Sequence, residues 1–145
     1  MSMSVMPCVL FLLSCAGRTE PASVTYDLPD IFPDYIYVTV PSNIAPLNFM
    51  IEGADHIRAS FFVEGQEVIV VDGRKGVLDI PQKKWDRLML LAEGKNVDVK
   101  VSQWSEEYPE GVEYAMFCFH VSPDRIDDWI AYRLIEPGYR SWRQI

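Results

Sequence analysis

The stretch IRASFFVEGQEVIVVDGRKGVLDI, residues 57–80, decides the fold class of this chain. Its first seven residues alternate between two faces, with the branched and aromatic side chains of Ile57 and Phe61 on the same face. A turn signal follows at residues 64–66, and the glycine-rich residues 72–76 are typical of a tight hairpin. The stretch therefore predicts three short β-strands in succession, at residues 57–63, 68–71 and 77–80.

The segments on either side extend the same pattern. Further strands are predicted at 35–40, 47–51, 97–101, 113–121 and 129–135. Between them, Trp85, Leu88, Met89 and Ala92 share one helical face, which predicts a helix over residues 81–93. Ser122 and Pro123 are typical of the start of one or two further helical turns. We therefore predict a mainly β domain, an immunoglobulin-like β-sandwich with one crossover helix, over residues 35–145.

The N-terminus has the pattern of an export signal. Residues 5–13 are almost wholly apolar; this run is too short to span a bilayer but fits the h-region of a signal peptide. It ends in Leu12-Leu13-Ser14-Cys15, which resembles a bacterial lipobox, although no Lys or Arg precedes it. We predict a signal peptide at 1–14, lipidation of Cys15, and a lipid-anchored tether at 15–34. The alternative is that these first residues form a buried strand or helix.

Cysteine use agrees with that prediction. Cys8 would leave with the signal peptide and Cys15 would carry the lipid, so Cys118 remains alone and no intramolecular disulfide is predicted.

Charge limits the partners of the chain. The formal net charge is −8, and an acidic surface repels phosphate backbones, so nucleic-acid binding is not expected. The expected contacts are the membrane, through the lipid anchor, and other envelope proteins. The expected location is the cell envelope, on the periplasmic or outer-membrane face. Ligand, membrane leaflet and oligomeric state are not predicted.

Two groups of residues could carry chemistry. Cys118 and His120 lie two apart on a predicted strand and so share a face, as a nucleophile and its base would. The alternative is a partly packed sheet face. His56, with Asp55 and Glu52, has no recognised metal-ligand spacing and is interpreted as part of a solvated turn. The common phosphate, haem, serine-hydrolase and zinc-protease motifs do not occur in the sequence, and we predict no cofactor and no metal.

Aromatic residues give a candidate binding surface. Trp104 beside Tyr108, and Trp142 beside Tyr139, are predicted to be exposed and able to contact a carbohydrate or a peptide. Trp85 and Trp129 are interpreted as core residues.

Two segments carry a family resemblance. Residues 41–49, PSNIAPLNF, and residues 127–139, DDWIAYRLIEPGY, resemble segments of TolB-like β-propeller lipoproteins of Bacteroidetes, which are linked to multihaem cytochromes or cytochrome c biogenesis. The resemblance implies that the chain is the N-terminal domain of such a protein. The propeller and the haem-type cysteine motif that follow in that group are not found in this sequence. No catalytic residue is implied.

These observations favour a non-enzymatic envelope lipoprotein domain that acts as a binding or scaffold module. The alternatives are an envelope hydrolase that uses Cys118 and His120, or a truncated remnant without an independent function.

Overall fold

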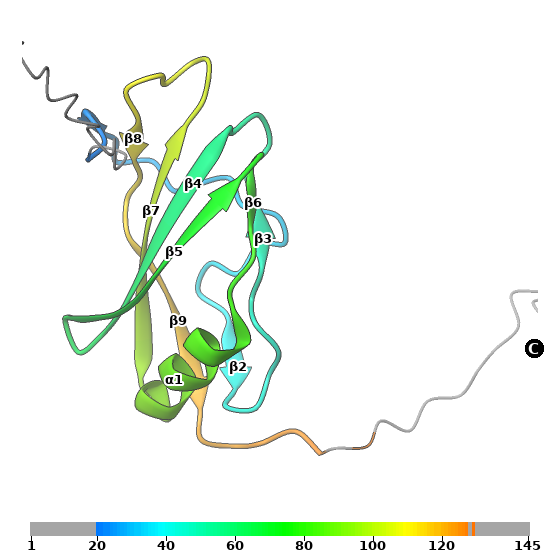
Figure 1. The fold of residues 1–145 in the computed structure, drawn as a ribbon. Coiled ribbons are helices and arrows are strands. Elements are labelled where there is room, and N and C mark those ends of the chain that lie inside the picture. Colours follow the sequence, from blue (N-terminus) through cyan, green and yellow to red (C-terminus); the bar gives the residue numbers. More distant parts are fainter. Residues whose placement is uncertain (1–19, 128, 130–145) are drawn as a thin grey trace, which may run out of the picture.

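Nine strands and one helix form the part of the chain that the computed structural model describes, residues 20–127 and residue 129 (Figure 1). The elements in chain order are β1 (Ser23–Val24), β2 (Thr39–Pro41), β3 (Phe49–Met50), β4 (His56–Val63), β5 (Gln66–Arg74), β6 (Val77–Leu78), α1 (Gln82–Ala92), β7 (Asn96–Trp104), β8 (Val112–Glu113) and β9 (Phe117–Ser122). None of the helices in these residues is long and apolar enough to cross a membrane.

All nine strands belong to one sheet, which curls into a half-barrel. Its main path runs β1-β8-β7-β4-β5-β6-β3, and β9 pairs with both β7 and β2. The prediction of a mainly β domain with one helix is confirmed. The strands are nevertheless joined continuously, not divided between two sheets, because one end of the long strand β7 pairs with β8 and the other end with β9.

The predicted turns of the β4–β5–β6 region are present. Glu64 and Gly65 have φ of 53° and 78°, and Lys75 and Gly76 have φ of 54° and 71°. Two successive residues of positive φ make the turn whose twist matches that of paired antiparallel strands. Both turns therefore join neighbouring antiparallel strands, and the β4–β5 pairing is continuous except for a register shift between Phe61 and Phe62.

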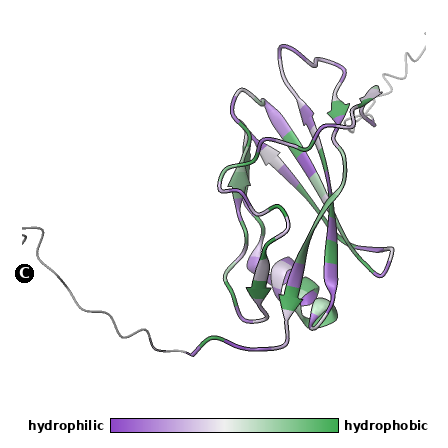
Figure 2. Cartoon of the chain, turned by 180° about the vertical axis from the view of Figure 1, so that it is seen from behind, coloured by the Kyte–Doolittle hydropathy of each residue, from purple (hydrophilic) through white to green (hydrophobic). Residues whose placement is uncertain are grey.

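The predicted helix is also present, and it lies at one end of the half-barrel (Figure 1). Trp85, Leu88, Met89 and Ala92 are its buried residues, as the helical spacing predicts. The Trp85 indole stacks on Phe119 at 6.2 Å between ring centroids. Apolar side chains of β4, β7 and β9 that face α1 complete the core, and the alternation of hydropathy along these strands is visible in Figure 2.

Four predicted strands are shorter or divided in the structure. Those expected at 47–51 and 77–80 are reduced to β3 and β6. The strand expected at 35–40 is reduced to β2, because Tyr37 has φ of 58° and interrupts the extended backbone. The strand expected at 113–121 is divided into β8 and β9. Glu113 pairs with Ser102 and Phe117 with Val99, so this stretch has one residue more than β7 opposite it, as in a β-bulge.

The described part of the predicted tether, residues 20–34, lies against the sheet. β1 pairs in parallel with β8, Phe32 bridges to Met50, and Pro29 and Ile31 are buried. The folded body therefore begins before residue 35. The predicted signal peptide and Cys15 lie outside the described residues.

The chain after β9 does not form the predicted helical turns. The Ser122 hydroxyl accepts a hydrogen bond from the Asp124 amide at 3.1 Å, which makes a local turn, and residues 124–127 have no regular structure. Trp129 is 89% exposed, so its interpretation as a core residue is wrong. The rest of the strand predicted at 129–135 lies outside the described residues.

Candidate functional site

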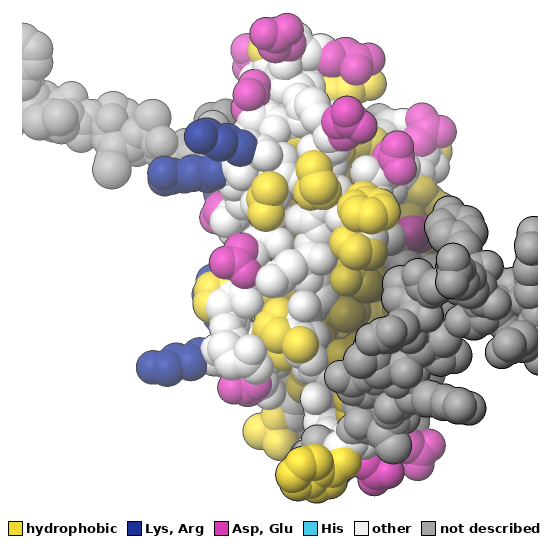
Figure 3. All heavy atoms as spheres, turned by 90° about the vertical axis from the view of Figure 1, so that its right-hand side faces the viewer, with side chains coloured by type: hydrophobic (Ala, Val, Ile, Leu, Met, Phe, Trp, Pro, Cys, Tyr) yellow, Lys and Arg dark blue, Asp and Glu magenta, His cyan; other side chains and the backbone are white. Residues whose placement is uncertain are grey.

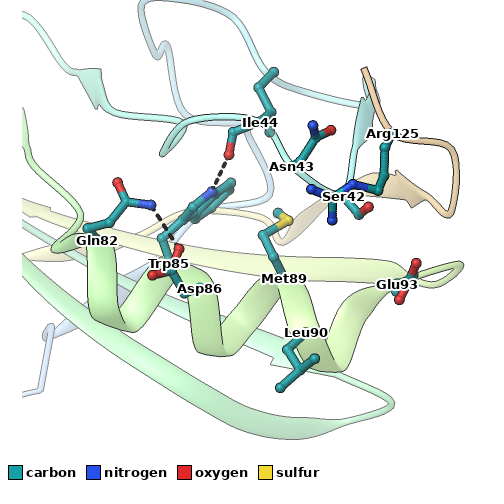
Figure 4. A pocket seen from close by; sticks show the side chains of 10 residues that line it. All are labelled: Ser42, Asn43, Ile44, Gln82, Trp85, Asp86, Met89, Leu90, Glu93 and Arg125. Carbon is teal, nitrogen blue, oxygen red and sulfur yellow. Dashed lines mark hydrogen bonds between the residues drawn. The ribbon is translucent and has the colours of Figure 1, made fainter. Parts of the chain in front are cut away.

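A groove lies beside α1, between the helix, the loop after β2 and the segment after β9 (Figure 4). Its volume is about 360 Å³. The helix contributes most of one wall, and the opposite wall comes from two segments that are far apart in the sequence. The lining residues are Ser42, Asn43, Ile44, Gln82, Trp85, Asp86, Met89, Leu90, Glu93 and Arg125.

Asn43 fixes one wall of this α1 groove. Its side-chain amide donates to the Ile126 carbonyl at 2.9 Å, and its carbonyl oxygen accepts the Ile126 amide at 2.9 Å. The two residues are 83 positions apart. Because both hydrogen bonds go to one residue's backbone, the Asn43 side chain sets the direction in which the chain leaves β9. The segment 41–49 therefore contacts the residue that directly precedes segment 127–139.

Other residues of segment 41–49 hold the helix in place. The Ile44 carbonyl accepts the Trp85 indole N–H at 2.9 Å. The Asn48 side chain accepts the Ile80 amide at 2.8 Å and donates to the Asp79 carboxylate at 3.0 Å, so it fixes the chain just before α1. The polar groups of this segment thus serve to position α1 and the groove walls.

The groove combines apolar and charged surface. Trp85 and Met89 form its buried floor, and Leu90 at its edge is 78% exposed. Asp86 and Glu93 lie on the helix side, and Asp86 accepts a hydrogen bond from Gln82 at 2.8 Å. Arg125 is the cation that lines it. Such a surface can receive an apolar side chain and a neighbouring basic group together.

The predicted aromatic surface is only partly as expected. Trp104 is 7% exposed, and its prediction as an exposed residue is wrong. It is covered because Gly111 lies directly over the indole, where a Cβ on that glycine would be 2.4 Å from Trp104 Nε1. Tyr108 is half-buried. Its hydrogen bond to the Glu107 carboxylate, and the charge of that group, raise the pKa of Tyr108 above its usual value. Tyr139 and Trp142 lie outside the described residues.

Cys118 and His120 share the outer face of β9, as predicted, and both are half-buried. His120 Nδ1 lies 2.9 Å from the Asn96 side-chain oxygen across the strand pair. Neither residue lines the α1 groove. In the part of the chain that the structure describes, no hydrogen bond joins the side chains of Cys118 and His120.

His56 is buried at the start of β4, so its interpretation as part of a solvated turn is wrong. Its Nε2 lies 3.1 Å from the Asp72 carboxylate, and its ring lies 5.2 Å from that of Trp104. No three or more His, Cys, Asp or Glu side chains are grouped to hold a metal within the described residues.

A second apolar surface lies on the β3–β6 side of the molecule, which faces the viewer in Figure 3. Met50 is paired with both Phe32 and Val77, and all three side chains are exposed. Asp30 and Glu52 adjoin Phe32 and Met50. Figure 3 shows yellow side chains between acidic groups on this face.

The α1 groove itself was not predicted from the sequence. A signal was available in segment 41–49, where Asn43 lies between Pro41 and Pro46 and Asn48 follows Pro46. Which backbone groups these asparagines bind depends on the tertiary fold. In comparisons with known proteins, the chain matches no family model, no curated protein and no solved structure.

Proposed function

We propose that this chain is a non-enzymatic binding module of the bacterial cell envelope, attached to a membrane through a lipid on Cys15, which docks a protein partner in the α1 groove. The observation that carries the proposal is the composition of the groove, where exposed Leu90 lies beside Asp86 and Glu93. The resemblance of segments 41–49 and 127–139 to propeller lipoproteins supports a β-propeller as the partner.

Charge defines the chemistry of the partner surface. The groove has two carboxylates and one guanidinium, and the whole chain has a net charge of −8. Complementary charge steers association and fixes orientation, so the docked surface carries a basic residue next to an apolar one. The apolar residue would contact Leu90, and the basic residue would lie near Glu93.

The fixed geometry of the groove supports binding. Asn43 and Asn48 hold its walls through hydrogen bonds, so little side-chain and loop ordering remains to be done when a partner docks. Cys118 and His120, the alternative catalytic pair, lie elsewhere, and His120 is engaged by Asn96.

Membrane attachment is tested by palmitate labelling of cells that express the full chain. We expect incorporation that is lost in Cys15→Ala. Label retained by this variant would show that Cys15 is not the anchor.

Docking is tested by placing a photo-cross-linking amino acid at position 90 of the full chain in intact cells. We expect one adduct with an envelope protein, through a peptide that contains Lys or Arg beside an apolar residue. Glu93→Lys should reduce this adduct severalfold, because it reverses the charge at the groove.

Glu106→Lys is the matched control, since it makes the same change in net charge at an exposed position that does not line the α1 groove. Equal loss of the adduct in both variants would point to general charge attraction. That result, or the lack of any adduct at position 90, would contradict docking in the groove.

A further inference from the structure

The outer face of the sheet has a second concave site, on the side opposite α1 and the core. The cross-strand pairs Ser60↔Lys100 and Arg58↔Ser102 place four polar side chains together in the middle of β4 and β7. They line a pocket of about 220 Å³. The pocket is completed by Glu20, Pro21, Glu67, Val70 and Glu113.

Two hydroxyl groups form the floor of this outer pocket. Ser60 is 6% exposed and Ser102 is 5% exposed, and both line the pocket. Neither hydroxyl has a hydrogen-bond partner among residues 20–127. Neither hydroxyl oxygen is among the fully buried side-chain atoms of the described residues that have no partner, so both hydroxyls open into the pocket. A ligand there can therefore hydrogen-bond to both hydroxyls in place of water.

Both cations of the pocket are already paired with carboxylates, one of which, Glu113, also lines the pocket. Arg58 Nε lies 3.0 Å from the Asp72 carboxylate, and Lys100 Nζ lies 3.4 Å from the Glu113 carboxylate. These ion pairs hold both cations at the sides of the pocket. The terminal nitrogens of Arg58 can still donate hydrogen bonds to a ligand, and the Glu113 carboxylate can still accept further ones.

This lining selects against small anions. Three carboxylates, from Glu20, Glu67 and Glu113, face two cations, so an anion would meet net repulsion in the pocket. A neutral ligand that carries several hydroxyls avoids this cost, because each hydroxyl both donates and accepts and can bond to serines, cations and carboxylates alike.

We propose that the outer pocket formed by Arg58, Ser60, Lys100 and Ser102 binds one ring of a neutral saccharide. A volume of about 220 Å³ is below the roughly 300 Å³ at which pockets for drug-sized ligands begin, which suits a single sugar ring. This inference goes beyond the proposed function, because it concerns a different face of the sheet and a different class of ligand.

The test is titration of the full chain, isotopically labelled for NMR, with glucose, galactose, mannose and N-acetylglucosamine. Inorganic phosphate, acetate and glycine are titrated separately. We expect at least one sugar to shift the amide signals of residues 58–60 and 100–102 saturably, and the three ionic probes not to do so.

Ser60→Ala together with Ser102→Ala should weaken this sugar binding at least tenfold. Lys100→Met tests the same pocket in case the double variant unfolds. Ser42→Ala, which removes a hydroxyl from the α1 groove instead, should leave it unchanged.

Three results would overturn the proposal. The first is a saturable shift of these amides with phosphate, acetate or glycine but not with sugars. The second is the absence of any shift with each sugar up to its solubility limit. The third is sugar binding that both pocket variants retain. None of these outcomes bears on the cross-link at position 90, so the two proposals fail independently.

Discussion

Single side chains of segment 41–49 connect parts of the fold that are far apart in the sequence. Asn43 is the clearest case, because its side-chain amide bonds to both the N–H and the carbonyl of Ile126, as a neighbouring strand would. A side-chain amide can do this since it carries one donor and one acceptor group in the same plane, as the backbone does. The pattern of prolines and asparagines in this segment is visible in the sequence, but the partner of the Asn43 amide is set by the tertiary structure.

Asn43→Ala should lower the free energy of unfolding by about 1–2 kcal/mol, the net value of two hydrogen bonds. It should also speed hydrogen exchange at the Ile126 amide, which NMR measures residue by residue. Asn96→Ala is the control, because the Asn96 side chain bonds to the half-buried His120 ring and, in the described part of the chain, makes no hydrogen bond to Ile126. Unchanged exchange at Ile126 in Asn43→Ala would show that the amide does not hold this segment.

Elements that depend on local patterns could be predicted well from the sequence. The β4–β5 hairpin and α1 follow from alternation, from glycine-containing turns and from helical spacing, all of which act over a few residues. The division between β8 and β9 could not be predicted, because the extra residue is defined only against β7 opposite it. The exposure of Trp104 was mispredicted for the same reason, since Gly111 covers it from a neighbouring segment.

The two turn glycines allow a matched prediction. Gly65 and Gly76 have similar positive φ, but a Cβ at Gly65 would meet nothing within 4 Å, whereas one at Gly76 would lie 2.4 Å from the Ile51 carbonyl oxygen. Gly65→Ala should therefore cost about 1 kcal/mol, for the left-handed backbone alone. Gly76→Ala should cost about 2–4 kcal/mol, because the clash with a backbone atom adds an overpacking penalty.

Urea unfolding of the full chain and both variants measures this difference. Equal losses would mean that backbone conformation accounts for the whole cost and that the hairpin can move away from Ile51.

At the scale of the molecule, the curl of the sheet separates two surfaces of different character. The inner side packs against α1, and the α1 groove forms at its margin, where helix, loop and the segment after β9 meet. The outer side keeps polar residues at alternate positions of β4 and β7, which is where the outer pocket lies. Residues 20–34 contribute to both sides, with Ile31 in the core and Glu20 and Pro21 at the outer pocket.

Deletion of residues 20–34 tests whether this segment belongs to the folded body or is a tether. The segment buries Pro29 and Ile31 and donates the Ala22 and Thr25 amides to the backbone at Glu110 and Glu113. Its removal should lower the free energy of unfolding by at least about 2 kcal/mol, since burying one isoleucine side chain contributes roughly 1.5–3 kcal/mol.

The single change Ile31→Ala should reproduce much of this loss, because it removes the same buried side chain while the chain length stays the same. Both are measured by urea unfolding against the unaltered chain. If the deletion left the unfolding free energy unchanged, residues 20–34 would act as a tether after all. The domain would then begin at residue 35, and a lipid at Cys15 would be separated from it by a flexible spacer. If the loss occurs as expected, residues 20–34 belong to the folded body, and the lipid proposed for Cys15 would be separated from β1 by residues 16–22 alone.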